Sequence, residues 1–252
     1  MIVVKLGGAA LKASLQNPAL FAPFRNVKDK LLIVHGGGPA INQLAEKMQL
    51  ATEFFEGQRV TTAEHMKVVE MVLSGSINPE IVRGLLIAGV RAVGLSGVDG
   101  KLLECVEENP KLGLVGKVTS VRSDVLDAIW EKGLTPVVSP VGLFENGQAC
   151  NVNADLAAAA LASQLGAEKL LFLTDKDGIL DAKGEALAQM SREDLEALNQ
   201  TPTISGGMKV KVRAILEFLE SRPGAEVAVM NGLDALPLTQ YFEGTHLGTA
   251  IR

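Results

Sequence analysis

Two glycine-rich turns are the parts of this sequence best suited to bind an anion. In the first, Lys5 is followed after one residue by Gly7 and Gly8; in the second, residues 35–39 read His-Gly-Gly-Gly-Pro. Glycine lets backbone amides approach a ligand, and proline at the first helical position favours a helix whose free N–H groups attract anions. A tight strand-to-helix turn alone would require fewer than three glycines. The second turn therefore indicates anion binding, whereas the first alone could be an ordinary turn after a surface lysine.

Two common phosphate-binding fingerprints are absent from the sequence. Neither Gly-x-x-x-x-Gly-Lys-Ser/Thr nor Gly-x-Gly-x-x-Gly occurs in the chain, so neither a Walker-type NTPase nor a dinucleotide-binding Rossmann domain is indicated. Glycine turns of other kinds also present backbone amides to anions. A phosphate-handling site of another type remains compatible with the two turns.

Polar residues farther along the chain could complete such a site. Arg59 lies on a turn ahead of an amphipathic segment, and its guanidinium could grip a carboxylate at two points, although arginines in this setting are usually surface residues. Alternate residues of an extended segment share a face, which brings Asn151, Asn153 and Asp155 together ahead of an alanine-rich helix. One of them would suffice as a helix N-cap, so the other two indicate a ligand.

Two further turns could contact a nucleotide. A glycine pair at residues 206 and 207 opens a helix with Lys209 and Lys211, whose side chains should point in different directions, so that one of them could reach a phosphate. The turn Thr-Asp-Lys-Asp-Gly at residues 174–178 follows a buried strand, where its Thr and Asp could meet a nucleotide. As a solvated turn it would require no ligand.

Composition and charge argue against several other classes of protein. A net charge of −5 provides no basic surface, so nucleic acid is not expected as a partner. Cys105 and Cys150 are too few for a disulfide framework and lack zinc-ligand spacing, which fits a reducing compartment. His35, His65 and His246 are scattered, and no Ser-His-Asp arrangement supports hydrolase chemistry. Without an export signal or an apolar segment of membrane-spanning length, we expect a cytoplasmic protein with no membrane partner.

The elements that must position these residues follow an alternating pattern. Short β-branched or apolar runs alternate with longer stretches of helical spacing, which is typical of βα units around a mostly parallel sheet. The composition, 47% hydrophobic and 4% aromatic, suits such a sheet with close-packed helices. We predict strands near residues 2–6, 31–34, 92–95, 136–139, 170–173 and 227–230, and helices near residues 39–49, 63–73, 155–164 and 208–220.

The segment between Lys101 and Arg122 breaks this pattern. It alternates polar and apolar residues and is interrupted by an Asn-Pro pair and a glycine. We therefore predict an antiparallel hairpin, inserted into the parallel scheme, that could form a lid. Because no long linker occurs, we also predict two tightly packed lobes that share one sheet, with a boundary near Gly166.

Taken in order, the motifs KLGG, HGGGPAI, GQRVT, NVNAD, LTDKDGIL and GGMKVK resemble the acetylglutamate kinase branch of the amino-acid kinase family over essentially the whole chain. The resemblance implies an α/β fold, a three-layer αβα sandwich around a mainly parallel sheet. It implies an N-terminal lobe, residues 1–165, for acceptor binding and dimerisation, and a C-terminal lobe, residues 166–252, for ATP. The implied reaction, in arginine biosynthesis, is phosphorylation of the side-chain carboxylate of N-acetyl-L-glutamate to N-acetyl-L-glutamyl 5-phosphate by ATP with Mg²⁺, without a tightly bound cofactor.

The same resemblance implies roles for individual residues. Lys5 and Lys211 are similar to the two lysines that neutralise charge on the transferring phosphoryl group, and Asp155 to the carboxylate that orients both. The implied acceptor-binding residues are Gly37, Gly38, Arg59, Asn151 and Asn153. The implied phosphoryl- and ATP-binding residues are Gly8, Thr174, Asp175, Lys176, Asp177, Gly178, Ile179, Leu180, Thr203, Ile204, Ser205, Gly207 and Met208. No metal-ligating residue is implied.

Two positions depart from the family pattern. Gln58 replaces the leucine that usually precedes the arginine, which bears on the identity of the acceptor, and Lys176 stands where a small or apolar residue is commoner. Arginine-inhibited hexameric members carry an extra N-terminal helix, whereas this sequence starts at its first strand, so we expect an arginine-insensitive homodimer.

Two alternative functions are compatible with the same motifs. One is a related kinase with another acceptor, such as acetylaminoadipate on a carrier protein, carbamate or an unmodified amino acid. The other is a non-catalytic nucleotide or amino-acid sensor of the same fold, because binding and chemistry are separable on one scaffold. Retention of both lysines and Asp155 argues against the sensor.

Overall fold

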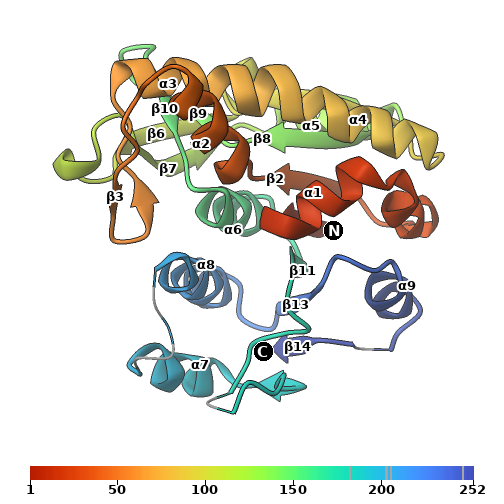
Figure 1. The fold of residues 1–252 in the computed structure, drawn as a ribbon. Coiled ribbons are helices and arrows are strands. Elements are labelled where there is room, and N and C mark those ends of the chain that lie inside the picture. Colours follow the sequence, from red (N-terminus) through yellow and green to blue (C-terminus); the bar gives the residue numbers. More distant parts are fainter. Residues whose placement is uncertain (182, 202–203, 205, 246) are drawn as a thin grey trace.

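An eight-stranded, mainly parallel sheet runs through the molecule (Figure 1). The computed structural model of the chain describes residues 1–181, 183–201, 204, 206–245 and 247–252. The strand order is β12-β14-β13-β11-β1-β2-β8-β5; β13 and β14 run antiparallel, and the other neighbouring pairs are parallel. The strands are β1 (Ile2–Leu6), β2 (Leu31–His35), β5 (Ala92–Ser96), β8 (Thr135–Ser139), β11 (Lys169–Thr174), β12 (Gln189–Met190), β13 (Glu226–Asn231) and β14 (Thr249–Ile251).

Helices cover both faces of this sheet. The α-helices are α1 (Gly8–Gln16), α2 (Gly38–Lys47), α3 (Ala63–Glu70), α4 (Asn78–Ile87), α5 (Asp124–Glu131), α6 (Ala154–Gln164), α7 (Arg192–Asn199), α8 (Gly207–Ser221) and α9 (Leu236–Phe242). A π-helical segment, η2 (Met71–Ile77), joins α3 to α4, and short 3₁₀ segments are η1 (Pro18–Asn26), η3 (Asp99–Lys101) and η4 (Pro110–Leu112).

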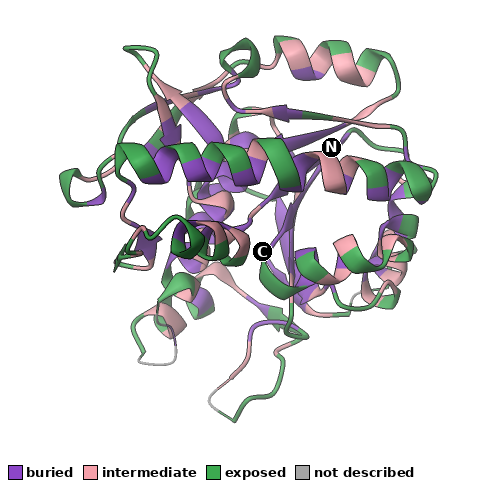
Figure 2. Ribbon diagram, turned by 45° about the horizontal axis from the view of Figure 1, so that its top comes forward, coloured by how far each residue is buried: buried purple, intermediate pink, exposed green. Residues whose placement is uncertain are grey.

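The side chains of the central strands alternate between two hydrophobic cores. Val3 and Leu32 pack in the core that includes α6 and α8, whereas Val4 and Ile33 pack in the core that includes helices α1 to α4. A period of two places successive side chains on opposite faces of a strand, so both faces of this sheet are buried. Figure 2 shows the buried strands inside and the exposed outer faces of the helices. This arrangement confirms the predicted αβα sandwich.

A four-stranded sheet and a two-stranded hairpin lie beside the main sheet. The four-stranded sheet has the order β10-β9-β6-β7 and contains β6 (Leu103–Glu107), β7 (Gly116–Val121), β9 (Val141–Phe144) and β10 (Ala149–Asn151); the hairpin contains β3 (Phe54–Phe55) and β4 (Gln58–Arg59). The predicted antiparallel hairpin is confirmed as β6 and β7. Because β6 also pairs with β9, this hairpin is built into a sheet, and its function as a lid stays a prediction.

The predicted strands and helices are present, with shifted ends. The largest difference follows residue 73, where the predicted end of a helix is wrong because the chain continues as a helix through η2 and α4 to Ile87. Gly75 and Pro79 commonly interrupt helices; here the π-helical segment spans the glycine, and the proline lies in the first turn of α4. Helices α1, α5, α7 and α9, which are nine residues long or shorter, were not predicted.

The main sheet continues across the predicted lobe boundary. Strand β1 pairs with β11 in parallel, with Ile2 opposite Lys169. A shared sheet is therefore present, while the division at Gly166 stays a prediction.

In the part of the chain that the structure describes, no helix is both long and apolar enough to cross a membrane.

Candidate active site

The residues predicted to do chemistry gather at the carboxyl edge of the main sheet. Lys5 is the next-to-last residue of β1, the glycine turn that begins at Gly36 follows β2, and Thr174 ends β11. Ligands of open α/β sheets bind outside the carboxyl ends of the strands. The topology thus brings distant segments to one edge.

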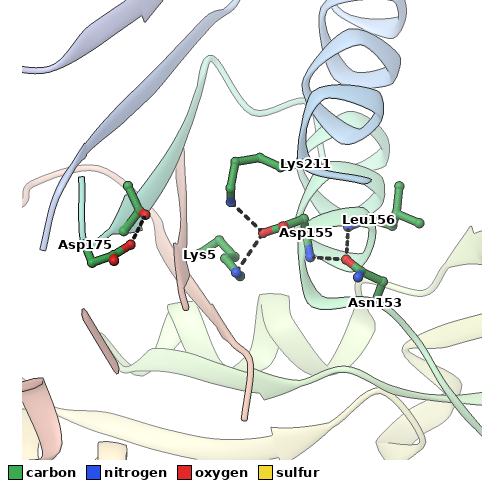
Figure 3. A network of polar contacts seen from close by, with 7 residues as sticks. Lys5, Asn153, Asp155, Leu156, Asp175 and Lys211 are labelled. Atoms are coloured by element: carbon green, nitrogen blue, oxygen red, sulfur yellow. Dashed lines mark hydrogen bonds and ion pairs between the residues drawn. The ribbon is translucent and has the colours of Figure 1, made fainter. Parts of the chain in front are cut away.

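Two lysines share one carboxylate oxygen at this edge (Figure 3). The Nζ atom of Lys5, on β1, lies 2.7 Å from Oδ1 of Asp155, on α6. The Nζ atom of Lys211, on α8, lies 3.1 Å from the same oxygen and 4.5 Å from the centre of the Phe172 ring. The three charged side chains are only 11–13% exposed. The structure therefore brings together the three residues predicted to be catalytic.

Burial and charge determine the protonation of this cluster. Burial acts to raise the pKa of Asp155, but the charges of Lys211 and Lys5 outweigh it and hold that pKa at about 2. Burial lowers the pKa of Lys211 to about 8; the charge of Asp155 opposes this shift and that of Lys5 adds to it. With two ammonium groups and one carboxylate, the cluster carries a net positive charge near neutral pH, which suits an anion.

Helix α6 holds Asp155 in place. The helix begins at Ala154, and the Oδ1 atom of Asn153 accepts hydrogen bonds from the backbone N–H groups of Asp155 (2.9 Å) and Leu156 (3.4 Å). The expectation that Asp155 precedes the helix is therefore wrong, because Asn153 is the N-cap and Asp155 lies within the first turn. The capping bond satisfies N–H groups that have no partner within the helix. It also fixes the backbone from which Asp155 projects.

A cavity of about 280 Å³ opens beside the charged cluster. Its walls include Lys5, Asp155 and Gly8 together with all five predicted acceptor-binding residues, which are Gly37, Gly38, Arg59, Asn151 and Asn153. The Nδ2 atom of Asn151 donates a hydrogen bond to Oγ1 of Thr61 at 3.1 Å, and this fixes the orientation of the amide. The predicted gathering of Asn151, Asn153 and Asp155 around one site is confirmed.

Arg59 has one unpartnered nitrogen in this setting. Its Nη2 atom donates to Oδ1 of Asn42 at 2.5 Å and to the Gly38 carbonyl at 3.4 Å, and the guanidinium stacks 5.0 Å from the ring centre of Phe54. Nη1 is buried and has no hydrogen-bond partner among the described residues. Burial lowers the pKa of Arg59 from its ordinary value. A buried, unpaired guanidinium nitrogen is costly, so this site favours a ligand with an acceptor oxygen.

At two positions around the cluster, glycine leaves space for neighbouring side chains. A Cβ atom at Gly7 would lie 2.2 Å from Nζ of Lys5, so a larger residue there would displace the ammonium from its place beside Asp155. A Cβ atom at Gly37 would lie 2.5 Å from side-chain atoms of both Leu73 and Ile77. Close approach is one reason for glycine in ligand-binding turns. Gly7, part of the first glycine turn, does not line the cavity but leaves the space that Lys5 occupies.

The buried side chain of His35 contacts the backbone of the second glycine turn. Its Nδ1 atom lies 2.9 Å from the Gly36 carbonyl, and its Nε2 atom lies 3.2 Å from Nδ2 of Asn78. Burial lowers the pKa of His35 to about 4, although the bond to Gly36 opposes this shift. The ring is therefore neutral, with Nδ1 donating and Nε2 accepting. In the sequence His35 opens the motif that contains the glycine turn, but no role was predicted for its side chain.

The predicted nucleotide-binding turn lies outside the cavity and faces solvent. Asp175, Lys176 and Asp177 are exposed, and Figure 3 shows Asp175 across β1 from the charged cluster. The Nδ2 atom of Asn231, the last residue of β13, donates to Oδ1 of Asp177 at 2.8 Å. Because this turn is exposed and lies at the same sheet edge as the charged cluster, a nucleotide could contact its side chains. Asn231 was not predicted, and only its place at the end of a strand could have indicated it.

Other predicted nucleotide-binding residues have structural contacts. The backbone N–H of Ile179 donates to Oγ1 of Thr249 at 2.8 Å, its carbonyl accepts from Leu187 N at 2.9 Å, and its side chain is buried. Ile204 is likewise buried in the core. Both side chains therefore support the site from within rather than facing a ligand.

The remaining predicted residues divide into three groups. Gly178 is buried and Leu180 is partly buried after β11. Gly207 and Met208 form the start of α8, the helix that carries Lys211. Thr203 and Ser205, and the histidine at position 246, lie outside the described residues.

Within the described part of the chain, no group of three or more His, Cys, Asp or Glu side chains is suited to hold a metal ion.

Comparison with known proteins agrees with this fold. The model of the amino acid kinase family matches residues 1–231. The chain therefore belongs to the amino acid kinase family, as the sequence motifs predicted.

Individual relatives point to one branch of that family. The chain is 44% identical to an acetylglutamate kinase from Geobacillus kaustophilus and 40% identical to one from Campylobacter curvus; the matches cover all of this chain and 96% and 91% of those proteins. Among solved structures, smu.665 from Streptococcus mutans superposes with a TM-score of 0.83 at 27% identity, over 99% of this chain and 97% of that one.

The charged cluster predicts a specific change in lysine titration. Because the charge of Asp155 raises the pKa of Lys211, an Asp155→Asn substitution should lower that pKa to below about 8. NMR titration of the Lys211 side-chain signal, assigned with a Lys211→Arg variant, measures the shift. A pKa in the unsubstituted protein near the ordinary 10.5 would contradict the buried cluster.

Proposed function

We propose that this protein transfers the γ-phosphoryl group of ATP to the side-chain carboxylate of N-acetyl-L-glutamate, forming N-acetyl-L-glutamyl 5-phosphate for arginine biosynthesis. The observation that carries the proposal is the buried pair of lysines on Asp155, beside a cavity into which Arg59 brings an unpartnered nitrogen. The full-length similarity to proteins named acetylglutamate kinase supports the choice of acceptor.

The chemistry requires charge neutralisation more than acid–base catalysis. A carboxylate is already a nucleophile at neutral pH, so its oxygen can attack the γ-phosphorus without a general base while the bond to the β–γ bridging oxygen breaks and ADP leaves. Lys5 and Lys211 supply fixed positive charge to the transferring group, and Asp155 holds both ammonium groups in position. Gly8 and the second glycine turn offer backbone amides.

The acceptor would occupy the cavity. Arg59 would bind one of its carboxylates, with Gly37 and Gly38 as neighbours, and Asn151 would contact the acetylated end. Asn153 lines the same cavity and would contribute its Nδ2 atom, because only its Oδ1 atom caps α6. Gln58 is buried and lines the same cavity. Its amide could influence which acceptor binds, because a buried polar group selects a partner that satisfies it.

ATP would bind as its complex with Mg²⁺ on the other side of the charged cluster. The exposed turn at residues 174–178 and the start of α8 are its proposed contacts. On this proposal residues 1–165 hold the acceptor, residues 166–252 hold the nucleotide, and the phosphoryl group crosses between them where Lys211 meets Asp155.

We also propose a cytoplasmic homodimer. Strand β5 is at one edge of the main sheet, and Leu86 and Ile87 at the end of the adjacent α4 are 52% and 73% exposed. An open sheet edge and exposed apolar residues favour association. Sedimentation equilibrium should give twice the chain mass of 26.6 kDa; the mass of a single chain would contradict the dimer.

A direct assay tests the proposed reaction. The protein is incubated with ATP and Mg²⁺, the acyl phosphate is trapped with hydroxylamine, and N-acetylglutamate is compared with acetylaminoadipate, aspartate, glutamate and carbamate. We expect N-acetylglutamate to give the most product. A preference for another acceptor would retain the lysine chemistry but change the substrate, and no turnover with any acceptor would favour a non-catalytic sensor.

Replacement of Arg59 tests the acceptor site. Arg59→Ala should raise the KM for N-acetylglutamate by roughly 10- to 100-fold, since a charge-assisted hydrogen bond contributes about 1.5–3 kcal/mol. The KM for ATP should change little. Arg122→Ala, which removes an exposed guanidinium outside the cavity, is the matched control. An unchanged acceptor KM in the Arg59 variant would assign Arg59 a structural role.

A further inference from the structure

Helix α8 is anchored by a second ion pair, away from the charged cluster. The Nη1 atom of Arg213 lies 2.6 Å from Oε1 of Glu108, which follows β6 in the connection to β7. The Glu108 side chain is only 8% exposed, and its Oε2 atom is buried without a hydrogen-bond partner among the described residues. Glu108 is thus a buried carboxylate that depends on one arginine.

Arg213 and Lys211 project from different sides of α8. Residues two apart on an α-helix are separated by about 200° around its axis. Lys211 reaches Asp155 on α6, whereas Arg213 reaches Glu108 in the connection between β6 and β7. The two ion pairs, in different directions, therefore add to the packing of the buried apolar face of α8 in restricting rotation of the helix about its own axis.

A backbone contact adds a third restraint near the start of the helix. A Cβ atom at Gly57 would lie 2.6 Å from the carbonyl oxygen of Gly206 and 3.3 Å from Gly207 N, so the turn between β3 and β4 rests directly on the start of α8. Lys209, Arg213, Glu108 and this turn together line a groove of about 450 Å³. Contacts from the N-terminal half of the chain therefore reach the first two turns of α8.

We propose that Glu108 and Arg213 form a positioning pair that fixes α8 so that Lys211 meets both Asp155 and the transferring phosphoryl group. This inference rests on the proposed kinase function. Neither residue lines the cavity with the charged cluster, so the pair acts through Lys211. A displacement of about 1 Å of a catalytic group can cost a factor of 100 in rate, so a pair remote from the reacting atoms can still control turnover.

Glu108→Gln tests the pair, because it preserves the shape of the side chain and removes its charge. We expect kcat to fall roughly 10- to 100-fold with the KM values for ATP and acceptor within about a factor of two, since the loss affects the transition state. Glu217→Gln is the matched control: Glu217 also accepts from Arg213, at 2.7 Å, but is 47% exposed. Its substitution should leave kcat unchanged, because exposed pairs contribute little.

The Lys211→Ala background separates positioning from general destabilisation. If Glu108 acts through Lys211, adding Glu108→Gln to Lys211→Ala should produce no further loss of kcat. A multiplicative loss in the double variant would overturn the proposal, and so would an unchanged kcat in Glu108→Gln. Arg213→Lys keeps the positive charge but removes the planar guanidinium, and it should lower kcat by a smaller factor. This variant provides the test if Glu108→Gln does not fold.

Hydrogen–deuterium exchange tests the anchoring without relying on activity. Amides in the first two turns of α8 should exchange faster in Glu108→Gln than in the unsubstituted protein, and at an unchanged rate in Glu217→Gln. Equal exchange in all three proteins would contradict the pair. An unsubstituted protein that lacks kinase activity yet shows the expected exchange would overturn the proposed function while leaving α8 anchored by Glu108.

Discussion

The rest of this structure depends on two lysines that share one buried carboxylate. The like charges of Lys5 and Lys211 repel each other, and the carboxylate of Asp155, within 3.1 Å of both ammonium groups, offsets that repulsion. Because each of the three groups comes from a different element, the contact is possible only when β1, α6 and α8 are fixed relative to one another. The small residues and the helix cap near the cluster help to hold these three elements in their relative positions.

Small residues make that convergence possible. Gly7 leaves space for the ammonium of Lys5, and the buried Ala157 and Ala158 let α6 pack closely in the core that also contains α8 residues. Asn153 caps α6 and thereby fixes the backbone of Asp155. A larger side chain at Gly7 would displace a charged group, so sterics and electrostatics act on the same residues.

On the proposed function, the acceptor occupies the cavity that Lys5 and Asp155 line, and the nucleotide contacts the turn that follows β11. Such an arrangement suits phosphoryl transfer, in which positioning and charge supply most of the rate enhancement. Lys211 belongs to α8, while Lys5 and Asp155 belong to elements on the acceptor side. If Lys211 contacts the phosphoryl group as proposed, a motion of α8 would displace its ammonium, so the contacts that hold this helix would affect the chemistry.

The sequence by itself determined the alternation of strands and helices, the hairpin formed by β6 and β7, and the motifs that identify the family, because these depend on local periodicity and on residues adjacent in the chain. It could not determine that Asn153 rather than Asp155 caps α6, or that α3 continues through a π-helical segment into α4, because competing local signals are resolved by packing. Nor could it pair His35 with Asn78 or Arg213 with Glu108. Those contacts join residues 43 and 105 positions apart, and only the tertiary fold decides which buried polar groups satisfy one another.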